Sequence, residues 1–389
     1  NDDCLFAEEN WELLVTSTHI FARGSKYCYA FNRNGRFLGQ IGNLGQGPGE
    51  YSYLTGFSID EKKQSLYLET LHTLLEYSWD GVFRQSTELP KDKHSSSLHG
   101  ISFVRDNLFI GHFDNHRGNL LHNFVLFDQS SKVIKLFDNY VQFTPKRGRA
   151  SWENRSMKPL RVGERIYVKE LSNDTLFYLN EQNELISRYV FDLGQYTSTI
   201  EKREYDSGND LLRVIYPEGI MIPTEGYSPM TGTQKHFFFG FMAYSLSGKY
   251  AFPKEMDIPI IASSGSELIS FQALGKRGDW HAVIGIYDIA NQKTQLLDTD
   301  PVSRMRGLIN DIDGGLSFWP RYYTSDNELV DIWRVEDMKE FLTEDYFAAH
   351  EIKDPEAHQK LKELAQKLDF EDNPVIVIGK LKPELMGEK

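Results

Sequence analysis

The sequence predicts an all-β protein, a six-bladed β-propeller with four-stranded blades and two short helices near the C-terminus. One hairpin pattern, in which alternating apolar residues flank a polar turn, returns along most of the chain. Aromatic residues favour strands and are abundant here, with 25 Phe, 20 Tyr and 6 Trp. Helical periodicity is absent before about Val335, which disfavours a fold of alternating strands and helices.

Five hairpins carry the repeat, and each has turn residues where its two strands must reverse. They are YCYAFNRNGRFLGQIG from Tyr27, LLEYSWDGVFRQSTEL from Leu74, NFVLFDQSSKVIKLFD from Asn123, DTLFYLNEQNELISRYVFD from Asp174 and VIGIYDIANQKTQLLD from Val283. The first four begin about 50 residues apart, which is a spacing typical of propeller blades.

The fourth and fifth hairpins are separated by about twice that interval. We interpret FFFGFMAYSLSGKYAF as the inner strands of a long fifth blade with insertions, and SELISFQALG as another strand of that blade. An extra hairpin is the alternative. A sixth blade then comes from GLINDIDGGLSFWPRYY, NELVDIWRV and NPVIVIGKLK, and a seven-bladed ring is the alternative.

Residues 1–389 are predicted to form one propeller domain, with a helical insertion at about 335–370 and a closing strand at about 374–382. In DPEAHQKLKELAQKLDF, Asp354 can cap a helix and Pro355 suits its first position. A second, weaker helix begins near Val335. The apolar run from Val375 to Ile378 would be exposed in a free tail, so we expect a strand of the final blade.

Charge and hydropathy narrow the class of protein. The formal net charge of −13 argues against a nucleic-acid partner, because phosphate binding needs a positive field. No apolar run approaches the roughly 20 residues of a membrane-spanning helix, so we expect no transmembrane segment. The N-terminus lacks the features of a signal peptide, which indicates either a cytoplasmic protein or a mature chain whose leader has been removed.

The two cysteines are Cys4 and Cys28. Their spacing leaves open whether they form a disulfide. Cys4 follows Asp2 and Asp3, which is a poor context for attachment of a lipid.

Four motifs in order, GQGPGEY, SNDTLFYLNEQNELISRYVFDLG, LINDIDGGLSFWP and LKELAQKLDFEDNPVIVIGKLK, carry a family resemblance. With them the chain resembles the NHL-like six-bladed β-propeller proteins of Gram-negative gut bacteria, from about Tyr27 to Lys382. The resemblance implies a propeller and an exported protein, either in the periplasm or on the cell surface as an outer-membrane lipoprotein with a lipid anchor upstream of this sequence. It implies no catalytic residues.

The stretch IGNLGQGPGEY, residues 41–51, is glycine-rich but lacks the features of a phosphate-binding loop. Its glycines do not follow the order G-x-G-x-x-G, and no lysine followed by Ser or Thr is present. Pro48 also removes an N–H that a phosphate would use. We interpret the stretch as the crossing from the outer strand of one blade to the inner strand of the next, which glycine conformations permit.

Two stretches have residues that suit metal ions. The candidates for zinc lie in GHFDNHRGNLLH and are His112, Asp114, His116 and His122. Asn310, Asp311 and Asp313 suggest calcium, but Gly315 stands where a third oxygen ligand is needed. A polar loop and a tight turn explain the two stretches better, so no metal and no cofactor is predicted.

One concentrated basic loop, TPKRGRASWENRSMKPLR, stands out in this acidic chain. It places six cations around Trp152, namely Lys146, Arg147, Arg149, Arg155, Lys158 and Arg161. An aromatic ring among guanidinium groups can bind a sugar, a carboxylate or a peptide terminus, and a solvated loop is the alternative.

Loops that enter the innermost strands of a propeller converge on one mouth of its channel, and we expect the functional surface there. The predicted ligand-binding residues are Glu50, Tyr51, Arg149, Trp152, Asn310, Asp311, Asp313 and Arg321. No nucleophile elbow is present, so the predicted function is non-catalytic binding of a peptide or carbohydrate at the cell envelope. A hydrolase or lyase acting on polysaccharide is the alternative, because 56 acidic residues offer many carboxylate pairs.

Overall fold

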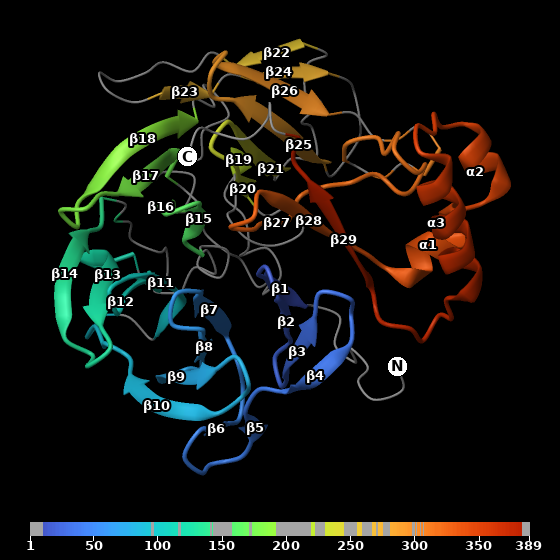
Figure 1. Cartoon of the computed structure of the whole chain (residues 1–389). Helices are drawn as coiled ribbons and strands as arrows, with labels where there is room; N and C mark the ends of the chain where they lie inside the picture. The colour runs from blue at the N-terminus through green and yellow to red at the C-terminus, as the bar shows by residue number, and fades with distance from the viewer. Residues whose placement is uncertain are drawn as a thin grey trace, which may run out of the picture.

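The computed structural model confirms the predicted six-bladed, mostly-β propeller, whose sheets surround one axis (Figure 1). It describes residues 11–94, 97–115, 118–140, 142, 158–170, 173–191, 219–221, 230–244, 255–258, 267–269, 271–274, 281–297, 300, 302–303, 305 and 307–382.

The first three blades are four-stranded antiparallel sheets whose strands follow one another along the chain. Blade 1 contains β1 (Glu12–Val15), β2 (His19–Arg23), β3 (Cys28–Asn32) and β4 (Phe37–Gln40). Blade 2 contains β7 (Gly56–Asp60), β8 (Ser65–Glu69), β9 (Thr73–Ser78) and β10 (Phe83–Glu88). Blade 3 contains β11 (Leu98–Arg105), β12 (Leu108–Phe113), β13 (His122–Asp128) and β14 (Val133–Asp138).

Burial along blade 2 shows why the sequence alternates less clearly in some strands than in others. The strand β8 is covered on both faces by neighbouring blades, and all five of its residues are buried. The outermost strand β10 buries Thr87 and leaves most of its other residues exposed. Strands covered on both faces therefore read as apolar runs, whereas outer strands read as polar ones.

Blades 4 and 5 carry additional strands. Blade 4 contains β15 (Leu160–Val162), β16 (Arg165–Val168), β17 (Thr175–Leu179) and β18 (Leu185–Phe191), with β23 (Glu267–Ile269) parallel to β18. Blade 5 contains β19 (Gly219–Met221), β20 (Thr231–Gly232), β21 (His236–Tyr244), β25 (His281–Asp288) and β26 (Lys293–Leu297).

The expectation that SELISFQALG forms a strand of blade 5 is wrong. β21 pairs directly with β25 over a long antiparallel ladder, so the intervening chain has no position between them. Its residues instead form β23 on the edge of blade 4, and β24 (Phe271–Leu274), which pairs with β22 (Glu255–Ile258). A period-2 pattern identifies a strand but does not identify its partner.

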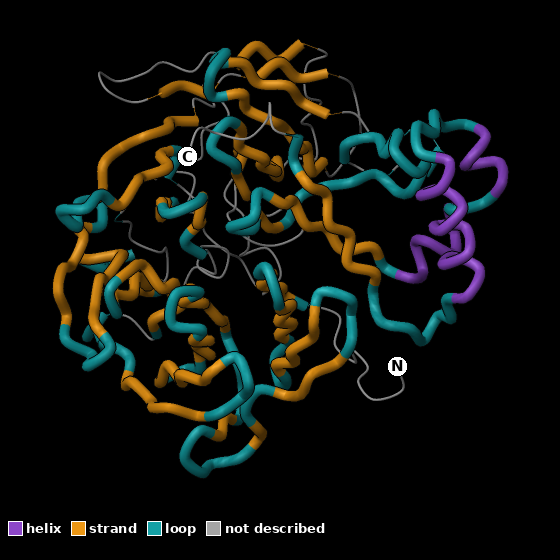
Figure 2. The backbone as a smooth tube through the Cα atoms, viewed as in Figure 1, coloured by secondary structure: helices purple, strands orange, loops and turns teal. Residues whose placement is uncertain are grey.

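Blade 6 differs from the others because helices interrupt it. Its described strands are β27 (Tyr322–Tyr323), β28 (Glu328–Trp333) and β29 (Val375–Lys380), in that order across the sheet. The run from Val375 to Ile378 is thus a strand, as predicted, and pairs antiparallel with β28. Between β28 and β29 the chain forms the helices, which lie together at one outer side of the ring (Figure 2).

Three helices are present where the sequence predicts two: α1 (Val335–Phe341), α2 (Glu344–Ala348) and α3 (Pro355–Lys367). The predicted helix from Val335 divides because Thr343 takes an extended conformation and its side chain accepts a hydrogen bond from the Tyr346 N–H. Asp354 caps α3 as predicted, accepting from the N–H groups of Glu356 and Ala357.

The stretch 41–51 is the crossing between blades that the sequence predicts. It connects β4, the outer strand of blade 1, to β7, the inner strand of blade 2, and it includes the short parallel pair β5 (Asn43–Leu44) and β6 (Glu50–Tyr51). Gly49 has a φ of +76°, and a Cβ there would lie 2.6 Å from the Phe83 ring. Glycine is therefore required at this corner.

Blades 1 and 6 meet through side chains. Their described strands, β1–β4 and β27–β29, form two separate sheets. Val330 of β28 packs in one core cluster with Leu13 and Phe31 of blade 1. At the edge of this cluster, Arg33 Nη2 lies 2.8 Å from Glu328 Oε2.

Candidate functional site

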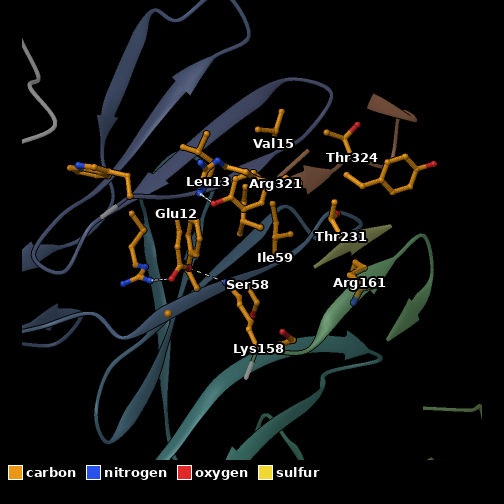
Figure 3. A pocket seen from close by; sticks show the side chains of 18 of the residues that line it. Glu12, Leu13, Val15, Ser58, Ile59, Lys158, Arg161, Thr231, Arg321 and Thr324 are labelled. Carbon is orange, nitrogen blue, oxygen red and sulfur yellow. Dashed lines mark hydrogen bonds and ion pairs between the residues drawn. The ribbon is translucent and has the colours of Figure 1, made fainter. Parts of the chain in front are cut away.

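A cavity of about 2280 Å³ lies within the ring of blades. Figure 3 shows side chains that line it, among them Glu12, Lys158 and Arg321. Its lining includes residues of the innermost strand of every blade, which are β1, β7, β11, β15, β20 and β27. The cavity is therefore the central channel of the propeller, and any ligand inside it would contact several blades.

The two ends of the channel differ in their residues. We call the end at which the chain enters the innermost strands the leading mouth; it includes Trp11, Tyr53, Lys158 and Arg321. The end at which the chain leaves these strands is the trailing mouth; it includes Lys63, Asp106, Glu164 and Ser325.

Glu12 is the centre of an ion cluster at the leading mouth. It pairs across the first hairpin with Arg23, whose guanidinium bonds to the Glu12 carboxylate, and Lys158 Nζ lies 3.0 Å from Glu12 Oε2. Burial opposes ionisation of Glu12, but attraction to Lys158 and Arg23 outweighs it and lowers the pKa of this carboxyl. Both cations also lie over the ring of Phe57, at 5.2 Å for Lys158 and 5.8 Å for Arg23.

Arg321 is oriented by a buried carboxylate behind it. Its Nε lies 3.1 Å from Asp331 Oδ1, and Asp331 also accepts from the Trp319 N–H at 2.8 Å. Burial raises the pKa of Asp331, and the charge of Arg321 opposes that shift. One third of the Arg321 side chain (33%) is exposed, and the residue lines the channel. The guanidinium is thus held from one side and open to the channel on another.

Tyr322 lies close enough to the ion cluster to respond to its charges. Its hydroxyl accepts a hydrogen bond from the Leu13 N–H at 3.0 Å. Burial and the charge of Glu12 raise the pKa of Tyr322, while Lys158 and Arg321 lower it by a smaller amount. Tyr322 thus lies within reach of the charges of Glu12, Lys158 and Arg321.

We call five side chains the mouth cluster: Glu12, Arg23, Lys158, Arg321 and Asp331. Three are basic and two are acidic. Further carboxylates, those of Glu336, Glu371 and Asp372, also line the channel. The mouth therefore combines charges of both signs.

A second polar cluster surrounds His99 on the channel wall. His99 Nε2 lies 3.2 Å from Asp114 Oδ2 and 2.6 Å from Ser97 Oγ, and Nδ1 lies 3.8 Å from Glu69 Oε1. Burial opposes protonation, but the hydrogen bonds and charges of Asp114 and Glu69 outweigh it and raise the pKa of His99 to about 9. His99 is therefore a cation at neutral pH and joins blades 2 and 3.

Comparison with known proteins identifies the family. The model of a family described as "Domain of unknown function (DUF4934)" matches residues 1–380. The chain belongs to this family. No curated protein matches this DUF4934 chain.

Two solved structures are similar to the DUF4934 chain to different degrees. A protein of Bacteroides fragilis named "Putative exported protein" is 17% identical with a TM-score of 0.63, over 98% of this chain and 93% of its own. A member of the DUF4221 family from Bacteroides vulgatus is 9% identical with a TM-score of 0.46, over 76% of this chain and 83% of its own. The first similarity shows that the propeller architecture extends over nearly the whole chain.

Glu50 and Tyr51, which the sequence predicts as ligand contacts, lie away from the channel of the DUF4934 chain. Tyr51 is 2% exposed in the core between blades 1 and 2, and its hydroxyl donates to the Ile41 carbonyl at 3.3 Å. The Glu50 carboxylate accepts from the Gly47 N–H at 2.7 Å. Both residues shape the crossing between blades.

Asn310, Asp311 and Asp313 form a turn that contacts α3. Asn310 Nδ2 donates to Asp313 Oδ1 at 2.7 Å, and Asp311 makes an ion pair with Lys353. Within the described parts of the chain, no group of three or more His, Cys, Asp or Glu residues is placed to hold a metal ion. These residues are not part of the channel lining.

The zinc candidates separate in the structure. His112 is buried against Phe124, Asp114 bonds within the His99 cluster, and His122 Nε2 lies 3.8 Å from Asp138 Oδ1. His116 lies outside the described residues, as do Arg149, Trp152 and Cys4. Cys28 is a buried, unbonded thiol.

Of the predicted ligand contacts that the structure describes, Arg321 lines the channel. Lys158 and Arg161, which belong to the basic loop TPKRGRASWENRSMKPLR, also line it. Sequence reasoning missed Glu12, Arg23 and His99, because each lies in an ordinary strand. For Glu12 a signal was present, because it is the first residue of the innermost strand β1 and so lies at the leading mouth.

Proposed function

We propose that this chain is an NHL-like propeller that binds a peptide or glycan, without catalysis, at the leading mouth of its central channel. The observation that supports the proposal is the mouth cluster, in which charged side chains from blades 1, 4 and 6 are oriented at one end of a large cavity. A concave site with a few oriented polar groups is the usual form of a ligand site. Arg149 and Trp152, which precede Lys158 in the same loop, are further proposed contacts.

The alternative is a propeller hydrolase or lyase that acts on polysaccharide. The observation in its favour is the contact of 2.6 Å between Ser97 Oγ and His99 Nε2 on the channel wall. A general base must be neutral to accept a proton, however, and the raised pKa keeps His99 charged at neutral pH. This contact therefore favours a structural role for His99.

Export to the periplasm or the cell surface is part of the proposal, with a lipid anchor upstream of this sequence. The name of the Bacteroides fragilis protein, which has the same fold, supports it. No described helix is long and apolar enough to cross a membrane. Cell fractionation of the full-length gene product, with protease treatment of intact cells, tests the location.

A glycan and peptide array with the purified protein tests the binding function. The matching variant is Thr55→Trp, which adds an indole at the leading mouth just before β7, and its control is Ile186→Trp on strand β18. We expect Thr55→Trp to weaken binding of every hit and Ile186→Trp to leave it unchanged. Unchanged binding by a folded Thr55→Trp protein would place the ligand away from the leading mouth.

A further inference from the structure

We infer that the ion pair between Glu12 and Lys158 is a bar across the leading mouth, and that this bar must open before a wide molecule can enter the channel. We call this pair the mouth bar. The inference goes beyond the proposed function, because it concerns access to the channel and does not depend on the identity of a ligand.

The mouth bar joins blades on opposite sides of the ring. Glu12 is the first residue of β1 in blade 1, and Lys158 lies two residues before β15 in blade 4. Lys158 Nζ nevertheless lies 3.0 Å from Glu12 Oε2, and Figure 3 draws this contact as a dashed line. Because blades 1 and 4 face each other across the ring in Figure 1, a contact between them spans the mouth.

One end of the mouth bar is fixed. Arg23 Nη1 donates to the Leu54 carbonyl at 3.2 Å, and the Arg23 guanidinium also bonds to the Glu12 carboxylate. The Glu12 carboxylate is therefore held at the boundary between blades 1 and 2. Lys158 reaches it through a flexible four-carbon stem, so Lys158 is the part of the mouth bar that can move.

The mouth bar lies above part of the channel wall. Lys158 Nζ lies 5.2 Å from the centroid of the Phe57 ring, in the innermost strand β7 of blade 2. Ile59 follows Phe57 by two residues, so it lies on the same face of β7 and roughly 7 Å farther from the leading mouth. Ile59 is half-buried and lines the channel. From this end, a molecule must pass the mouth bar to reach Ile59.

The trailing mouth is also crossed by a contact between blades that are not neighbours. Ser325 Oγ donates to Glu61 Oε2 at 2.9 Å, which joins the turn between β27 and β28 in blade 6 to the turn between β7 and β8 in blade 2, past blade 1. The contact at the leading mouth is an ion pair, whereas the contact at the trailing mouth is a hydrogen bond. We therefore expect the width of the leading mouth to depend on ionic strength.

The mouth bar is weak enough to open. The side chains of Lys158 and Glu12 are 22% and 25% exposed, so solvent and salt partly screen their attraction. Side-chain rotation is fast, and the pair is therefore an equilibrium between a closed and an open state. A wide molecule enters in the open state, whereas a small molecule can pass beside the closed bar.

Thiol labelling of the intact protein measures access to the channel. The reporter protein carries Ile59→Cys beneath the mouth bar and Cys4→Ser, and its buried Cys28 detects unfolding. The small probe is N-ethylmaleimide, and the wide probe is a maleimide attached to polyethylene glycol. We expect Lys158→Met to accelerate labelling by the wide probe about tenfold, as for a bar that is closed about nine-tenths of the time. Labelling by the small probe should change less than about twofold, because that probe does not need the open state.

Two further measurements separate the mouth bar from other causes. Raising the NaCl concentration should accelerate labelling of the reporter protein by the wide probe, and should not do so in Lys158→Met, which has no ion pair to screen. Lys62→Met, at the exposed rim of the trailing mouth, is the matched control and should leave both rates unchanged.

Four outcomes would overturn the inference. The first two are equal rates of the wide probe with and without Lys158→Met, and a rate in the reporter protein that does not respond to NaCl. The third is equal acceleration of both probes, which would show that the wall loosens. The fourth is faster labelling in Lys62→Met, which would place the entrance at the trailing mouth. If Lys158→Met exposes Cys28, the NaCl dependence of the reporter protein decides. These rates need no ligand, so the array with Thr55→Trp tests the proposed function separately.

Discussion

Tyr51 follows a polar, glycine-rich stretch and nevertheless lies in the core. Its ring packs with Cys28 and Leu54, residues of blade 1 and of the chain entering blade 2. Tyr53, two residues later, is 48% exposed at the leading mouth. Tyr51 is therefore a core residue, whereas Tyr53, in the same loop, has a ring exposed at the leading mouth.

We expect Tyr51→Ala to lower the free energy of unfolding by about 3 kcal/mol or more, because it leaves a cavity between two blades. Tyr53→Ala should change it by less than about 0.5 kcal/mol. Urea unfolding followed by tryptophan fluorescence measures both. Equal stability of the two variants would show that Tyr51 is not a core residue.

His99 should make stability depend on pH. Its pKa is raised from 6.5 to about 9 in the folded protein, so its contribution is complete below pH 6.5 and is lost as pH rises through 9. The facing groups are Glu69 on β8, Asp114 after β12 and Ser97. The contribution is on the order of 3 kcal/mol at its maximum.

The test is the free energy of unfolding at pH 6.5 and pH 9 for the parent and for His99→Gln. The parent should lose more stability than the variant over this interval. The same loss in both proteins would mean that His99 is not held as a cation by the two carboxylates.

At the scale of elements, β29 is the strand that connects the helices to the ring. One of its faces packs Ile376 and Ile378 toward blade 1, and the other packs Val375 and Val377 with the helical residues. The same strand supplies the outer partner of β28. Its removal would expose both cores together.

Truncation after Asp369 should therefore destabilise the whole propeller and not the helices alone. We expect a melting temperature lower by several degrees or more and a loss of cooperativity in calorimetry. Lys380→Ala, at the exposed end of the same strand, is the control. A truncated protein with the parent melting temperature would show that closure does not need β29.

At the scale of the whole molecule, blades 1 and 6 meet side by side, and among the described residues their strands belong to separate sheets. Apolar side chains pack around Val330 in this contact, and Arg33 with Glu328 adds a partly buried ion pair. This interface therefore combines apolar packing with a few polar contacts, and replacing them should weaken the ring.

A double-mutant cycle of Arg33→Gln and Glu328→Gln should give a coupling energy of about 0.5–1 kcal/mol, because both side chains are partly removed from water. The exposed pair Lys91 and Glu88 in blade 2 is the comparison, and its coupling should be close to zero. Equal coupling in the two cycles would mean that the closure pair contributes no more than a surface pair.

Local patterns in the sequence predict the propeller architecture. Hairpins with a period of 2, and the turn residues between their strands, depend on local chemistry. The pairs β3–β4, β9–β10 and β13–β14 and the capped helix α3 could therefore be predicted. The crossing at residues 41–51 could also be predicted, because glycine and proline restrict the backbone locally.

The pairing partners of strands and the contacts of side chains depend on the tertiary structure. Three features depend on contacts between residues that are far apart in the sequence. They are the pairing of β23 with blade 4, the burial of Tyr51 and the contact of Glu12 with Lys158. A strand pattern specifies which residues share a face, but packing between blades decides which face is covered. Arg321 could be predicted for the mouth because it lies beside an inner strand, whereas Glu12 and Arg23 required the ring that brings blades 1, 4 and 6 to one axis.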